Sequence, residues 1–220
     1  TAIPRSDADI PITLICSWGF PLSKYHQVAP IKITETRFTH KIAGPVYVAD
    51  FRGVVPPGYD SYFRELHSLI NIDSFAGQYR NAEPPEPYVL SQRISHMGEY
   101  MFVIIAESII EENWICPEFS QALLSGAVPI YFGAPNVDHF LPGDGAIVNG
   151  NDFSTAQELA VYITRVAADV ELYRKTHLSW KESRLPVSFQ EHLNNCAHLA
   201  ECRICKKVLE IMENNEIAKQ

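Results

Sequence analysis

The sequence predicts an α/β fold, with a parallel sheet that carries helices on both faces. Strand-like and helix-like segments alternate from about residue 45 to residue 180, the order expected of such a sheet. A strand, a helix and a second strand follow one another within residues 101–132. Both strands, 101–106 and 128–132, are short apolar runs that suit strands buried on both faces. A strand, helix and strand at this spacing form a right-handed βαβ unit.

The helix of this unit carries its own start and stop signals. Pro117 suits the first helical position, because its φ is already helical and its missing N–H is not needed there. Phe119, Ala122 and Leu123 recur at the spacing that places them on one helical face. Gly126 supplies the left-handed residue that ends many helices. The spacing therefore predicts a helix that starts at Pro117 and stops at Gly126.

The other elements are predicted from periodicity and from turn signals. Thr155 and Glu158 have the spacing of a capping box at the start of a helix. The helix after residue 58 is expected to bury one apolar face, made of Tyr62, Phe63, Leu66, Leu69 and Ile70. Further strands are expected at 12–16, 46–51, 72–75 and 146–148, and further helices at 88–100, 155–167, 169–181 and from 189 onward.

Composition and charge exclude two classes of protein. The net charge is −8 and the isoelectric point is near 5.5, whereas nucleic-acid binding requires clustered Lys and Arg. The apolar runs are far shorter than the roughly 20 residues that cross a bilayer. We therefore expect no nucleic-acid partner, and membrane attachment only through a segment outside this chain.

Several motifs resemble the carboxyl-terminal half of the α1,3/4-fucosyltransferases. Residues 102–107 match the pattern F-V-I-x-x-E, and residues 122–135 match A-L-L-x-G-A-V-P-I-Y-x-G-x-P. Residues 152–160 resemble the family segment D-F-x-S-P-x-E-L-A, and residues 5–10 resemble R-R-D-S-D-I. The resemblance covers most of the chain.

The resemblance implies a GT-B-type architecture, in which two Rossmann-like domains face each other and the second holds GDP-fucose. Residues 1–44 would then be a remnant of, or a link to, the amino-terminal acceptor domain. Residues 45–185 would be the Rossmann-like donor-binding domain, and 186–220 a helical tail. The implied reaction is inverting, metal-independent transfer of fucose from GDP-fucose to a glycan or glycoprotein hydroxyl, without a cofactor, in the Golgi or endoplasmic reticulum lumen.

The candidate donor-binding residues lie at the carboxyl ends of the predicted strands, where open parallel sheets bind ligands. Glu107 keeps the family's Glu, and is either a ribose or base contact or a solvated loop acid. Ser108 takes the place of the family's Asn. Trp114 takes the place of a Tyr, and either stacks on the base or sugar or anchors the loop.

Both cations that the family uses for the diphosphate are replaced in this chain. Glu118 occupies the position of the phosphate-binding Lys, and Tyr59 the position of an Arg before the first helix of the domain. An acid close to a diphosphate repels it. Arg64 or Arg52 could compensate, since both follow the first strand of the domain. The alternatives are a transferase for a different nucleotide sugar and a non-catalytic binding or scaffold module.

The resemblance assigns no catalytic base within this chain, because the family's general base precedes the segment that matches residues 5–10. It is therefore expected upstream of Thr1. Arg5, Asp7 and Asp9 match the family's interdomain motif, and could equally form a structural turn.

The cysteines near the end of the chain allow three interpretations. Cys196, Cys202 and Cys205 lie close together, with two His nearby. The family often has a carboxyl-terminal disulfide, so the resemblance favours a disulfide. Free core thiols and half of a zinc site are the alternatives, although no second Cys pair with regular spacing completes such a site.

Overall fold

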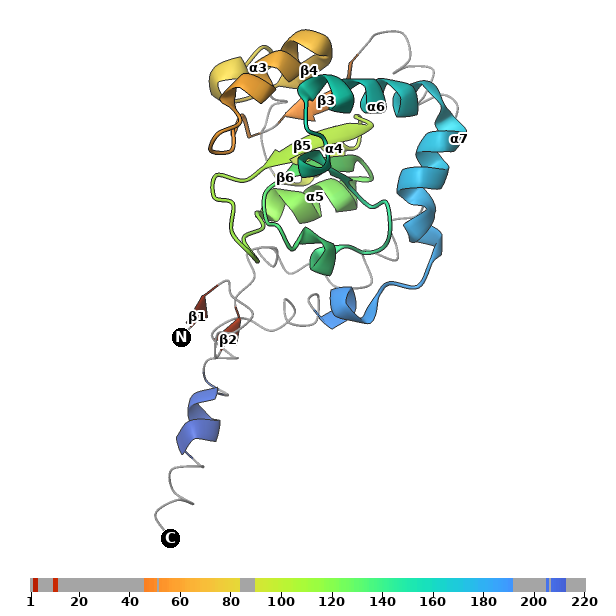
Figure 1. Cartoon of the computed structure of the whole chain (residues 1–220). Helices are drawn as coiled ribbons and strands as arrows, with labels where there is room; N and C mark the ends of the chain where they lie inside the picture. The colour runs from red at the N-terminus through yellow and green to blue at the C-terminus, as the bar shows by residue number, and fades with distance from the viewer. Residues whose placement is uncertain are drawn as a thin grey trace.

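The structure, a computed structural model, describes residues 2–3, 10–11, 46–50, 52–83, 90–191, 205 and 207–212. Its centre is a five-stranded parallel sheet with the strand order β4-β3-β5-β6-β7 (Figure 1). The strands are β3 (Val46–Asp50), β4 (Asn71–Ser74), β5 (Phe102–Ala106), β6 (Val128–Phe132) and β7 (Val148–Asn149). Each agrees with a predicted strand to within two residues at either end.

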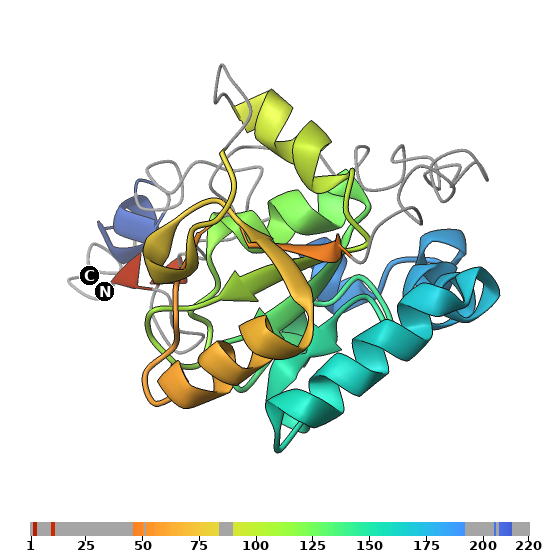
Figure 2. The ribbon, with the colours of Figure 1, turned by 90° about the horizontal axis from the view of Figure 1, so that it is seen from above.

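Helices cover both faces of this sheet, as predicted. Helices α3 (Asp60–Leu69) and α6 (Ala156–Ala168) lie on one face, and α4 (Leu90–Met97) and α5 (Pro117–Ser125) on the other (Figure 2). The two faces correspond to two apolar clusters, because successive strand residues point to opposite sides. In β5, Val103 and Ile105 belong to the cluster on the α5 side, whereas Phe102 and Ile104 belong to the cluster on the α3 and α6 side.

The βαβ unit β5–α5–β6 forms as the sequence predicts. Strands β5 and β6 pair in parallel, with Phe102 opposite Val128. Pro117 is the first residue of α5, and Gly126 ends it with a φ of 83°. The predicted face of α5, made of Phe119, Ala122 and Leu123, is buried.

Two predicted helices differ from the structure. In α3, Phe63 and Leu66 are buried, but Leu69 is 38% exposed, so its assignment to the core is wrong. Leu69 is the last residue of α3, where the chain turns towards β4. The single helix expected at 169–181 is instead a series of one α-helical, one π-helical and one 3₁₀ segment: α7 (Val170–Tyr173), η5 (Arg174–Leu178) and η6 (Ser179–Glu182).

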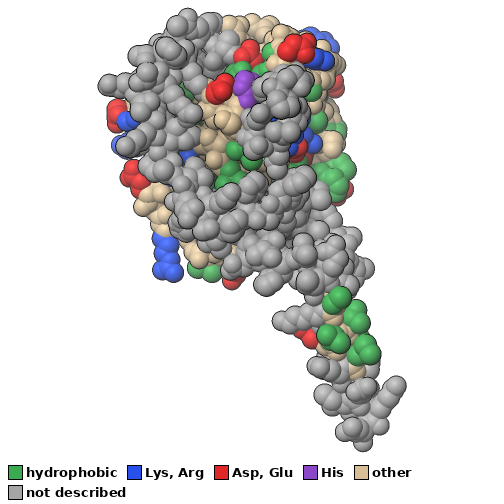
Figure 3. All heavy atoms as spheres, turned by 180° about the vertical axis from the view of Figure 1, so that it is seen from behind, with side chains coloured by type: hydrophobic (Ala, Val, Ile, Leu, Met, Phe, Trp, Pro, Cys, Tyr) green, Lys and Arg blue, Asp and Glu red, His purple; other side chains and the backbone are tan. Residues whose placement is uncertain are grey.

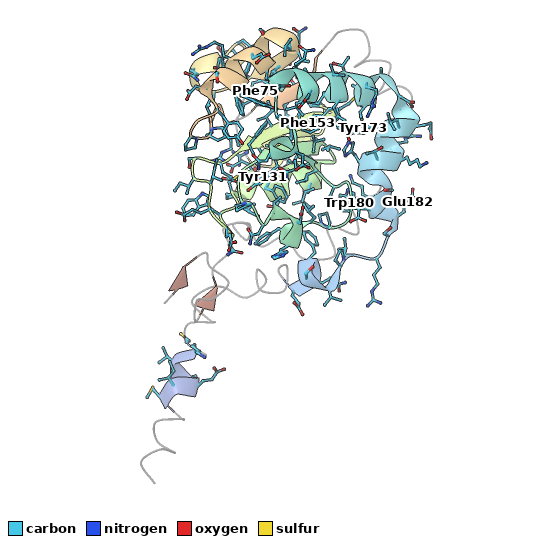
Figure 4. All side chains as sticks on the ribbon, in the orientation of Figure 1. Phe75, Tyr131, Phe153, Tyr173, Trp180 and Glu182 are labelled. Carbon is cyan, nitrogen blue, oxygen red and sulfur yellow. The ribbon has the colours of Figure 1, made fainter. Side chains whose placement is uncertain are left out.

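This irregular series is held to the body of the molecule by buried aromatic residues. Tyr173 stacks edge-on against Phe102 and donates its hydroxyl to the Met101 carbonyl over 2.8 Å (Figure 4). Trp180 is also buried, against Gly143. The other short 3₁₀ helices in the described ranges are η2 (Gly77–Tyr79), η3 (Val137–Phe140) and η4 (Gly150–Asp152).

The ends of the chain are described only in part. Strand β1 (Ala2–Ile3) pairs in parallel with β2 (Ile10–Pro11), and the strand expected at 12–16 lies outside the described residues. Residues 207–212 are helical, and their apolar side chains are exposed (Figure 3). Within the described ranges, no helix is long and apolar enough to cross a membrane.

Candidate functional site

The strand order places a topological switch point at the carboxyl edge of the sheet, the position where open parallel sheets have their ligand crevice. The chain runs from β3 to β4 on one side, then crosses back to place β5, β6 and β7 on the other side of β3. The order therefore reverses between β3 and β5. In open parallel sheets, ligands bind at such a switch point, beyond the carboxyl ends of the two strands.

Arg52 bridges this switch point. It follows the end of β3, and its Nη1 donates to the carbonyl of Ala106, the last residue of β5, over 2.8 Å. The backbone around it is fixed by Asp50, whose Oδ1 accepts from the N–H groups of Arg52 at 3.0 Å and Gly53 at 2.8 Å. Burial raises the pKa of the Asp50 carboxyl, and these two donors oppose that rise. The guanidinium is thus placed by the strand end itself, and its side chain is 21% exposed.

Glu107 lies beneath Arg52 and is completely buried. Its Oε1 accepts from the Cys116 N–H over 2.7 Å, and its Oε2 lies 3.4 Å from the Arg52 Nη1. A Cβ at Gly133 would come within 2.4 Å of the Glu107 side chain, so this packing requires glycine there. The interpretation of Glu107 as a solvated loop acid is therefore wrong. Arg52 and the Cys116 N–H stabilise the carboxylate in its buried position.

Glu118 lies between two arginines. Its Oε1 is 3.4 Å from the Arg93 Nη1 of α4, and its Oε2 is 3.9 Å from the Arg52 Nε. Glu118 belongs to the first turn of α5, where a negative charge is also favoured by the helix dipole. Arg93 was not identified from the sequence, because a pair between two helices that are far apart in the chain leaves no local pattern.

The two loops of the edge are joined by a pair of amides. The Asn113 N–H donates to Asn136 Oδ1, and Asn136 Nδ2 donates to Asn113 Oδ1, both over 2.9 Å. Trp114 is half-buried, and its carbonyl accepts from the hydroxyl of Tyr131, which lies inside the body (Figure 4). Ser108 is exposed in the same loop.

Tyr59 lies at the same edge, beside the ends of β6 and β7. It is the N-cap residue of α3, its ring packs edge-on against Phe132, and its hydroxyl donates to Asn151 Oδ1 over 2.9 Å. Asn151 was not identified from the sequence, although it directly precedes the D-F segment at 152. Arg64 is exposed on α3, more than one turn from the helix start.

The Cys116 thiol and the Tyr131 phenol of the site have raised pKa values. Burial raises the pKa of the Cys116 thiol well above its usual value, and the nearby Glu107 carboxylate raises it further. Burial also raises the pKa of Tyr131. Both groups remain protonated near neutral pH. Four charged side chains of the edge, Arg52, Arg93, Glu107 and Glu118, form ion pairs with one another.

Comparison with known proteins identifies the family. The model of the family described as "Glycosyltransferase family 10 (fucosyltransferase) C-term" matches residues 57–220. The chain belongs to glycosyltransferase family 10. The resemblance of its motifs to the fucosyltransferases is therefore confirmed.

The relatives are longer proteins. The chain is 29% identical over 199 residues to GDP-fucose protein O-fucosyltransferase 3 of Xenopus tropicalis, an alignment of 82% of this chain and 42% of that protein. It is 26% identical over 181 residues to alpha-(1,3)-fucosyltransferase B of Drosophila melanogaster, and this alignment covers 71% of this chain and 41% of that protein. The chain thus spans less than half the length of these family 10 relatives.

A solved structure supports the fold. The crystal structure of an alpha1,3-fucosyltransferase with GDP-fucose superposes with a TM-score of 0.51 at 17% identity, over 79% of this chain and 60% of that one. At this identity, the likeness concerns the fold alone. It confirms the predicted GT-B-type, Rossmann-like sheet flanked by helices.

The remaining predicted residues are divided between the described and undescribed parts of the chain. Arg5, Asp7, Asp9, Cys196 and Cys202 lie outside the described residues. Cys205 is described and its thiol is free and exposed, whereas its predicted partners are not described, so the disulfide stays a prediction. Among the described residues there is no group of three or more His, Cys, Asp and Glu that could hold a metal ion.

Proposed function

We propose that this chain is the donor-binding half of a fucosyltransferase that takes fucose from GDP-fucose and delivers it to a glycan or glycoprotein hydroxyl. The observation that carries the proposal is the family 10 match over residues 57–220. The crevice between β3 and β5 supports it, because nucleotide ligands of such sheets bind there. The general base would come from outside this chain, and the protein would work in the Golgi or endoplasmic reticulum lumen.

The candidate donor-binding residues would act from three sides of the crevice. Arg52 lies at its centre, and Glu107 holds it there. Trp114 offers a half-buried aromatic ring on one side, and Tyr59 offers a ring and a hydroxyl at the start of α3 on another. Ser108 and Arg64 are exposed, and would contribute only at the rim.

A non-catalytic binding module of the same fold is the second candidate. Glu118 favours it, because an acid occupies the position where the family pattern has a phosphate-binding Lys. The four ion-paired side chains also cancel in charge, since Arg52 pairs with Glu107 and Glu118, and Arg93 pairs with Glu118. A transferase for another nucleotide sugar is a third candidate, with the altered Pro117-Glu118 pair as its specificity difference.

Calorimetric titration tests these functions directly. The chain is titrated with GDP and GDP-fucose, and with UDP and ADP as controls. Selective binding of the guanine nucleotides supports the fucosyltransferase, whereas preference for UDP or ADP supports another donor. If no nucleotide binds to this chain or to a longer protein that includes the preceding half, the donor-binding proposal is wrong and the non-catalytic module is favoured.

A further inference from the structure

We propose that Arg52 supplies the positive charge that meets the phosphates of the ligand, and that Glu118 competes with those phosphates for it. This inference rests on the proposed function, and it concerns how the crevice can hold a diphosphate without the family's Lys. The cation would come from the turn after β3 rather than from helix α5.

The position of Arg52 is the first argument. Ligands bind between the carboxyl ends of β3 and β5, and Arg52 joins those two ends through its bond to the Ala106 carbonyl. Its side chain is 21% exposed, so a ligand in the crevice can reach it. Arginine suits this task, because its planar fork of N–H donors matches the oxygens of a phosphate group.

The unused donors of Arg52 are the second argument. Its Nη1 is engaged by Ala106 and Glu107, and its Nε faces Glu118 at 3.9 Å. Among the residues that the structure describes, no group accepts a hydrogen bond from Nη2. Arg52 is therefore anchored on one side and retains donors on the other.

The loose contact with Glu118 is the third argument. A separation of 3.9 Å is an ion pair but too long for a hydrogen bond. The other oxygen of Glu118 lies closer to Arg93, at 3.4 Å. When a phosphate takes its place beside Arg52, Glu118 retains Arg93 and is not left as an unpaired charge.

Arg64 does not fit this role. It is exposed on α3, and no described contact links it to the ends of β3 or β5. Of the two arginines that the sequence suggested as replacements, the geometry favours Arg52.

The test measures binding of inorganic pyrophosphate and of GDP by calorimetry. We expect Glu118→Gln to bind both ligands about three- to tenfold more tightly, because a like charge near the phosphates is removed. Removal of Arg52 alone would leave Glu107 buried without its cation, so the double variant Arg52→Gln/Glu107→Gln is used. This double variant should lose pyrophosphate binding.

The control variants isolate Arg52. Glu107→Gln retains Arg52 and can still accept from the Cys116 N–H, so the difference in pyrophosphate affinity between this variant and the double variant gives the effect of removing Arg52. Arg165→Gln removes an exposed arginine from α6 and should leave pyrophosphate binding within about twofold, since exposed charges are screened. Arg64→Gln tests the other arginine that the sequence suggested as a replacement, and should weaken pyrophosphate binding far less than the double variant does. Circular dichroism and thermal unfolding check that each variant is folded.

The outcomes separate this inference from the proposed function. If GDP binds selectively, but neither Glu118→Gln nor the folded double variant changes its affinity, the role of Arg52 is overturned while the donor-binding function stands. A loss of binding on Arg64→Gln overturns it as well. If the wild type, Glu118→Gln and a longer protein all fail to bind GDP, the proposed function itself is wrong.

Discussion

At the scale of single residues, the crevice depends on side chains that hold other parts of the edge in place. Asn113 adopts a φ of 63°, a left-handed conformation that Asn and Asp tolerate better than most residues. Its main-chain N–H donates to the Asn136 side chain and its side-chain oxygen accepts from it, and these two hydrogen bonds join the loops at 107–116 and 133–142. Trp114, a candidate stacking residue, directly follows Asn113, so its position depends on this pair.

We predict that replacing Asn by Asp costs less stability at position 113 than at position 136. Asn113→Asp keeps the acceptor for Asn136 Nδ2, and should change the free energy of unfolding by less than about 0.5 kcal/mol. Asn136→Asp replaces that donor with an oxygen that faces Asn113 Oδ1, and should destabilise the protein by about 1–3 kcal/mol. Urea unfolding of both variants gives the comparison. Equal losses of unfolding free energy in the two variants would show that the hydrogen bond from Asn136 Nδ2 to Asn113 Oδ1 does not contribute to stability.

His177 should make the protein sensitive to acid. It is buried, its Nδ1 lies 2.8 Å from the Gly145 carbonyl, and its Nε2 lies 2.9 Å from the Tyr162 hydroxyl. The carbonyl can only accept, so Nδ1 carries the proton and Nε2 accepts from Tyr162. Burial lowers the pKa of His177 below its usual 6.5 and raises that of Tyr162, so both are neutral at pH 7.

The sign of the pH dependence follows from this shift. Below about pH 6.5 the unfolded chain binds a proton that the folded chain does not bind, so acid favours unfolding. The contribution of neutral His177 is fully present above pH 6.5 and is lost as the pH falls through the lower pKa of the folded state. Urea unfolding between pH 7.5 and 5 should show a shallower loss of stability in His177→Gln than in the wild type. Identical slopes would argue against this role of His177.

At the scale of elements, prediction succeeds where the signals are local. Helix α5 has its Pro117 start, its Gly126 stop and its apolar face within ten residues, and the structure has all three. The segment at 169–181 has a helical period too, but it forms an irregular series. There Gly145 approaches so closely that a Cβ would lie 1.9 Å from the Thr176 carbonyl oxygen. Positions 145 and 176 are far apart in the chain, so the local hydrophobic periodicity of 169–181 cannot predict their contact.

The capping box of α6 is an element whose contribution can be measured. The Glu158 N–H donates to Thr155 Oγ1 over 3.2 Å, and the Thr155 N–H donates to Glu158 Oε2 over 3.3 Å. Thr155→Ala removes the cap acceptor and should cost about 1 kcal/mol of stability. Thr155→Ser keeps the hydroxyl and should cost less than half of that. Thermal unfolding compares the two, and an equal loss would assign the effect to the methyl group.

At the scale of the whole molecule, the sequence predicts the edge of the sheet where the candidate site lies, but not the arrangement of charges there. The carboxyl edge of the sheet, Glu107, Glu118 and Tyr59 could all be predicted, because motif order and strand ends are readable from the chain. The neutral group of Arg52, Arg93, Glu107 and Glu118 could not, because its members come from three separate parts of the chain. Strand order brings them together, and it too appears only in the folded molecule.

The charge arrangement leads to a prediction about the whole protein, made by restoring the family's cation with Glu118→Lys. In the free protein, the introduced ammonium group would face Arg52 and Arg93 in place of a carboxylate, so we expect a loss of about 1–3 kcal/mol of stability. With GDP, the same three cations would surround the phosphates, and we expect its affinity to rise by about tenfold or more. Because a ligand stabilises the state that it binds, GDP should raise the melting temperature of Glu118→Lys more than that of the wild type.

Calorimetry and thermal unfolding with and without GDP measure the two effects separately. Arg165→Glu, a charge reversal on the exposed face of α6, is the matched control and should change neither GDP affinity nor the response of the melting temperature to GDP. A Glu118→Lys protein that is destabilised but binds GDP no better would place the diphosphate away from residue 118. A gain in affinity would instead mean that this chain retains the family's phosphate site, and that Glu118 lowers the affinity of that site for GDP.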